Sequence, residues 1–147
     1  MPKDKPDHHD AELVIRLYDL RREAVMRASR DTINAGFFPR DYGEFLAVTK
    51  PEHPHNAAFR QVSTYWEMVY GMAHHEIVHA EYLVENSGEG MFLFAKVAPH
   101  LQRFREEVAP HAFRHAEWAA TQTATGRRYL ELFQSRLAAR ASAAAGR

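Results

Sequence analysis

The segment His75-Glu76-Ile77-Val78-His79 has the residue types and the spacing of a catalytic zinc site. On a helix, its two histidines would lie one turn apart and could bind the same metal ion. The carboxylate of Glu76 could then act as the general base on a metal-bound water. One of two alternative functions is therefore a zinc-dependent hydrolase, with His75 and His79 as metal ligands and Glu76 as the catalytic base.

These five residues resemble the signature of the zincin metalloproteases. The resemblance ends at His79, because residues 80–85 contain neither the glycine nor the third histidine of the metzincin extension. Zincins also hold their substrate at the edge of a β-strand, and the sequence has no alternating strand pattern. The default expectation is therefore no cofactor, with zinc as the alternative.

A second pair of histidines, His111 and His115, has the same i, i+4 spacing. If these residues lie on a helix, they too could bind one metal ion. His111 and His115 are therefore further candidate metal ligands beside His75 and His79.

Apolar residues recur at helical spacing through most of the chain. The predicted fold class is all-α, a bundle of four to five helices with one long central helix at about 56–86. The other predicted helices cover about 10–34, about 41–49, about 93–108 with a kink or break at Pro99, about 110–124, and a last stretch that opens at Thr125 or Gly126.

The predicted central helix is apolar on more than one face. On a helical wheel His75 and His79 fall opposite its main apolar stripe, together with Met68, Met72 and Tyr82. Such a helix is either central within one chain or shared with a partner. We expect a homodimer through this face, and the four histidines of two chains could then share one metal ion.

The chain has 147 residues, which is the length of one domain. We expect a helical domain over 10–140, a disordered lead-in over 1–9 and a frayed tail over 141–147. The 19 basic and 19 acidic residues balance, so no nucleic-acid surface is expected. The absence of cysteine excludes disulfides and cysteine-bound metals. No apolar run could span a membrane and no secretory signal is present, so we expect a cytoplasmic protein.

The layout of the segments 17–27, 55–62 and 65–68, followed by 88–90 and 95–97, is similar to that of small uncharacterised bacterial all-helical proteins, a domain of unknown function. The resemblance implies an all-helical fold over most of the chain. Its motifs serve packing and capping, so the resemblance implies no functional residues.

The function that the sequence favours is a soluble helical binding or interaction module that self-associates. The alternative is the zinc hydrolase described above. The two differ in the positions of His75 and His79, which the enzyme needs beside a third ligand in an open cleft.

Overall fold

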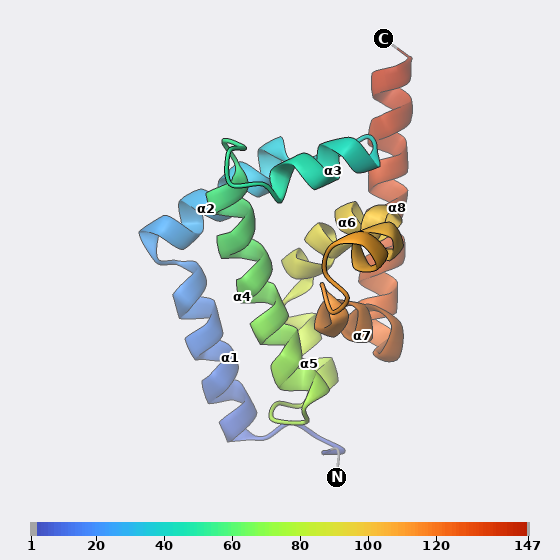
Figure 1. Cartoon of the computed structure of the whole chain (residues 1–147). Coiled ribbons are helices and arrows are strands. Elements are labelled where there is room, and N and C mark those ends of the chain that lie inside the picture. The colour runs from blue at the N-terminus through green and yellow to red at the C-terminus, as the bar shows by residue number, and fades with distance from the viewer. Residues whose placement is uncertain (1–2, 147) are drawn as a thin grey trace.

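The computed structural model describes residues 3–146, and within this range its regular elements are all α-helices (Figure 1). The predicted all-α fold is confirmed, but the described residues form eight helices instead of four to five. These are α1 (His8–Arg21), α2 (Ala24–Gly36), α3 (Tyr42–Val48), α4 (Asn56–His74), α5 (Ala80–Glu85), α6 (Gly88–Glu107), α7 (Arg114–Gln122) and α8 (Ala124–Ala145). None of the described helices is long and apolar enough to cross a membrane.

The helix predicted over 10–34 is two helices, α1 and α2, because Glu23 starts a new one. Its carboxylate accepts hydrogen bonds from the backbone N–H groups of Val25 (3.0 Å) and Met26 (2.9 Å) and caps α2. The apolar spacing continues across this break, so periodicity alone does not reveal it.

Helices lie close to both ends of the described chain. α1 begins at His8, and α8 continues to Ala145. The lead-in predicted over 1–9 and the tail predicted over 141–147 are thus each partly helical. The first two residues and the last residue lie outside the described range.

Pro99 lies inside α6 and does not end it. Leu93 and Val97 before the proline, and Leu101 after it, are all buried in the same core. Packing on both sides of Pro99 therefore outweighs the lost helical hydrogen bond. The next predicted helix, about 110–124, begins later than expected, at the start of α7.

α4 lies at the centre of the molecule (Figure 1). It packs against α2 and α7, while α6 packs against α8. The core contains the fully buried side chains Ile33, Phe45, Trp66, Tyr70 and Met91. In Figure 1 the C-terminal part of α8 extends beyond the other helices, so this end of α8 has a side that no other helix covers.

The junction between α7 and α8 is tightly closed around Thr123. The Thr123 hydroxyl donates to the Ala119 carbonyl (2.6 Å) and accepts the N–H of Gly126 (2.9 Å). A Cβ atom on Gly126 would collide with the Ala119 carbonyl oxygen, which is backbone and cannot move aside. Only glycine fits here, and this fixes the direction in which α8 leaves α7.

We predict that Gly126→Ala lowers the free energy of unfolding by about 2 kcal/mol or more, because overpacking a closed junction forces the backbone apart. Gly146→Ala is the control, since its nearest neighbour would be 3.4 Å away. Chemical denaturation of both variants measures the effect. Equal stability of the two variants would contradict this description of the junction.

Candidate functional site

The segment with the zinc-site pattern does not lie on one helix. α4 ends at His74, and residues 75–79 form a turn before α5. Glu76 adopts a left-handed backbone conformation, with φ of 62°. His75 is the C-cap of α4 and His79 is the N-cap of α5. The prediction of one continuous helix at 56–86, with these two histidines one turn apart, is therefore wrong.

The buried carboxylate of Asp10, in α1, holds this turn in place. It accepts the backbone N–H groups of His79 (3.0 Å) and Asp7 (2.8 Å), and the Lys3 ammonium contacts it at 3.1 Å. Burial alone would raise the pKa of Asp10, but these backbone donors and Lys3 together lower it to about 2. Asp10 is thus ionised at neutral pH, and its charge is compensated by the turn that it holds.

His79 is used as a helix cap. Its Nδ1 accepts the backbone N–H of Tyr82 at 3.1 Å, so the neutral ring has its proton on Nε2. Metal binding through Nε2 would move that proton to Nδ1 and break the cap. Zinc binding by His75 and His79 thus stays a prediction, without the helical geometry that suggested it.

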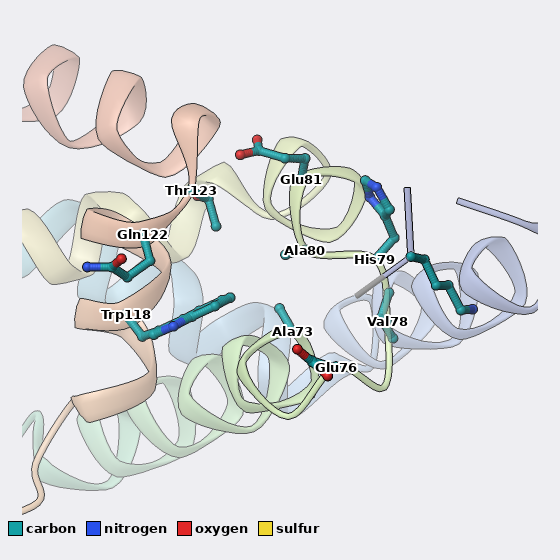
Figure 2. A pocket seen from close by; sticks show the side chains of 10 residues that line it. Ala73, Glu76, Val78, His79, Ala80, Glu81, Trp118, Gln122 and Thr123 are labelled. Carbon is teal, nitrogen blue, oxygen red and sulfur yellow. The ribbon is translucent and has the colours of Figure 1, made fainter. Parts of the chain in front are cut away.

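A pocket of about 280 Å³ lies beside this turn. Figure 2 shows the side chains that line it. Its polar lining includes Glu76, His79, Glu81 and Gln122, with Trp118 as an aromatic wall. Figure 2 also shows that the side chains of Glu76 and His79 leave the turn in different directions. The Glu81 carboxylate is engaged in capping α8, because it accepts the first N–H groups of that helix at 2.6 and 3.1 Å.

The side chains of His74, His75 and His115 form a histidine cluster between the end of α4 and the start of α7. The Nδ1 atoms of His74 and His115 are 2.9 Å apart, and the ring of His75 lies 5.3 Å from that of His115. His74 also stacks on Trp118, with ring centroids 4.7 Å apart. Burial lowers the pKa values of His74 and His115, and the positive charge of Arg114 lowers both further. The fold thus places His115 beside His75, whereas the sequence spacing paired His115 with His111.

The predicted pair of His111 and His115 is not on one helix, because α7 begins only at Arg114. His111 lies in the preceding turn and is exposed. Across residues 3–146, no group of three or more histidines and acidic residues is arranged to hold a metal ion.

The face predicted to form a homodimer is also divided by the turn. Met68 is 46% exposed on α4, and Met72 on the same helix is half-buried. His75 is exposed in the turn, whereas His79 and Tyr82 are half-buried at the start of α5. These five residues do not share one helical face, and self-association through them stays a prediction.

A groove that the sequence did not indicate runs along α8, and we call it the α8 groove. It lies between α8, α6 and the segment Phe38–Arg40, and it consists of two cavities of about 520 and 670 Å³ that share Phe38, Leu137 and Arg140. The apolar part of its lining is Phe38, Pro39, Phe92, Ala95, Pro99, Phe133, Leu137, Ala141 and Ala144.

Lys96 lines the α8 groove and is only 4% exposed. Its ammonium donates to the Ile33 carbonyl (3.0 Å) and lies over the rings of Phe38 (4.1 Å) and Phe92 (4.2 Å). Burial, together with Arg140, lowers the pKa of Lys96 to about 7. The sequence has a signal for Lys96 alone and not for the groove, because Lys96 lies within the otherwise apolar run 91–98 and charged residues are seldom buried without a partner.

We predict that Asp10→Asn lowers the free energy of unfolding by about 2 kcal/mol at pH 7, because the backbone N–H groups of Asp7 and His79 lose a charged acceptor. Since the pKa of Asp10 is depressed, this contribution is present above pH 4 and lost as the pH falls towards 2. The difference from wild type should therefore shrink in acid. Asp19→Asn, on the exposed side of α1, is the control. If the unfolding free energies of Asp10→Asn and wild type differ by the same amount at all pH values, the ionised carboxylate of Asp10 does not hold the turn.

We also predict that stability falls as the pH is lowered from about 6.5, because His74 and His115 bind protons more weakly in the folded than in the unfolded state. Two protonated rings could not keep the Nδ1–Nδ1 hydrogen bond. His115→Gln should make the plot of unfolding free energy against pH shallower between pH 7 and 5. His111→Gln should leave its slope unchanged. The prediction fails if both variants keep the wild-type slope.

Comparison of the chain with curated proteins and with solved structures found no match. A family model described as "Domain of unknown function (DUF4760)" matches residues 6–123. The match includes all of α1 to α7, with the turn at 75–79 and the histidine cluster, whereas α8 follows it. Because the match covers most of the chain and the matched residues form one helical array, the protein belongs to this family, Domain of unknown function (DUF4760).

Proposed function

We propose that this chain is a helical ligand-binding module and that its α8 groove binds the aliphatic chain of an amphiphile. The supporting observation is the row of apolar side chains, among them Phe92, Phe133 and Leu137, that line the groove and remain only half-buried. Covering apolar surface gains roughly 25 cal/mol per Å², so a ligand chain that lies along them is stabilised. The two cavities also fall within the usual range of small-molecule sites.

The charges around the groove favour a small amphiphile over a second copy of the chain. Arg136 and Arg140 lie on its rim, and Arg40 lies on its opposite wall. Two copies that docked through this face would place arginines against arginines across a two-fold axis. Self-association through another face stays a prediction, and ligand binding does not depend on it.

The alternative function, a zinc hydrolase, has less support. The helical register of His75, Glu76 and His79 that suggested it is replaced by a turn. His79 and Glu81, on the other side of that turn, cap two helices. The α8 groove has more space than the pocket beside the turn, and apolar lining residues such as Phe92 and Leu137 cap no helix.

We predict that the protein binds decanol, a neutral aliphatic probe, and that Leu137→Asn weakens this binding about tenfold. Leu137 lies outside the core cluster, so its replacement changes the groove while the fold stays intact. The loss corresponds to about 1.4 kcal/mol, close to the value of burying part of one leucine. Displacement of a fluorescent naphthylamine dye by decanol measures the affinity.

Leu132→Asn is the matched control, because Leu132 is a leucine of the same helix that is 43% exposed and does not line the groove. It should leave decanol affinity unchanged. Ala141→Phe, which fills the groove from the same helix, should weaken binding as Leu137→Asn does. If wild type does not bind decanol, or if all three variants bind it equally, the groove is not the binding site.

A further inference from the structure

Two cationic side chains, Lys96 and Arg140, meet at one aromatic ring in the α8 groove. The Lys96 Nζ atom lies 4.1 Å from the centre of the Phe38 ring, and the Arg140 Cζ atom lies 3.7 Å from it. Among residues 3–146, no carboxylate forms an ion pair with either cation. Two like charges in one partly buried site repel each other, and an anion between them would remove this repulsion.

The acidic group of the groove is already engaged. Glu89 lines one of the two cavities, but its carboxylate is held by the Arg30 guanidinium at 2.7 and 2.8 Å and by the Asn34 amide at 3.0 Å. Across the groove, Arg40 is paired with Glu44 at 2.6 Å. The charges of Glu89 and Arg40 are therefore satisfied by their own neighbours, whereas Lys96 and Arg140 have no carboxylate partner among the described residues.

The Lys96 ammonium also has unused hydrogen-bonding capacity. It has three N–H donors, and the described residues provide one acceptor, the Ile33 carbonyl. The rings of Phe38 and Phe92 stabilise the positive charge from their faces but accept no conventional hydrogen bond. A buried cation with donors to spare, beside an open cavity, is suited to bind a negatively charged oxygen.

We propose that the α8 groove selects an amphiphile with a carboxylate head group, which binds between Lys96 and Arg140 while its aliphatic chain lies along Phe133 and Leu137. The proposal rests on the function proposed above and adds the head group to it. The carboxylate would accept hydrogen bonds from both cations, and the Phe38 ring would hold them at a fixed separation.

The test compares three ten-carbon probes, decanoate, decanol and decylamine, by displacement of the same naphthylamine dye. Wild type should bind decanoate about tenfold or more tightly than decanol, because charge-assisted hydrogen bonds form only with the carboxylate. Decylamine should bind more weakly than decanol, because its charge repels Lys96 and Arg140.

Arg140→Gln and Lys96→Met should each bring the ratio of decanoate affinity to decanol affinity close to one. The ratio is taken within each variant, so a change in the groove that affects both probes equally cancels. Arg140 is exposed, so its variant tests the proposal even if replacing buried Lys96 disturbs folding. Arg16→Gln removes an exposed arginine of α1, far from the groove in sequence, and should keep the preference.

Binding of decanoate should also be coupled to a proton. Burial and Arg140 lower the pKa of Lys96 to about 7, and a bound carboxylate raises it again, so the protein should take up a proton on binding near pH 8. Calorimetry in buffers of different ionisation enthalpy measures this uptake, and Lys96→Met should abolish it.

If wild type binds decanoate and decanol equally well, the proposed carboxylate head group is wrong. The proposed binding of an aliphatic chain in the α8 groove is then unaffected. A preference for decanoate that survives both Arg140→Gln and Lys96→Met would also overturn the proposed head group. If the proposed ligand-binding function itself is wrong, the result is different, because wild type will then bind neither decanoate nor decanol.

Discussion

The buried carboxylate of Asp10 is the interaction on which the arrangement of the helices around α4 depends. It joins α1 to the turn at 75–79 through the backbone N–H of His79. Because this turn ends α4, the following helix can turn back, and Glu81 on α5 then caps the start of α8. Two ionised side chains, Asp10 and Glu81, thus join α1 to the turn and α5 to α8, and both are stabilised by backbone donors.

The polar side chains of the turn at 75–79 and of the α8 groove differ in what they bind. Asp10, His79 and Glu81 accept backbone N–H groups, so their charge or lone pairs serve the fold. Lys96 and Arg140 share an aromatic ring and have no carboxylate partner in the described chain. Because polar groups in a folded interior are normally paired, Lys96 supports the proposed ligand site, whereas the side chains at the turn do not.

The sequence predicts the all-helical fold because apolar spacing is a local property, but it does not predict the breaks. The turn after His74 depends on Asp10, which is far away in the chain. Residues 75–79 contain no glycine or proline that would predict a turn. A signal for the histidine cluster was present in Gly71, inside α4, where a Cβ atom would lie 3.2 Å from the His115 ring. The groove could not be predicted, because α8 and the segment Phe38–Arg40 meet only in the folded chain.

The position of the ligand can be observed directly by nuclear magnetic resonance, in a titration of the nitrogen-15-labelled protein with decanoate. We expect the largest shifts of backbone amides at residues 92–98 of α6 and 133–144 of α8, which line the groove. Shifts centred on residues 73–81, around the pocket of Figure 2, would contradict a site in the α8 groove and would place the ligand beside the turn that contains Glu76.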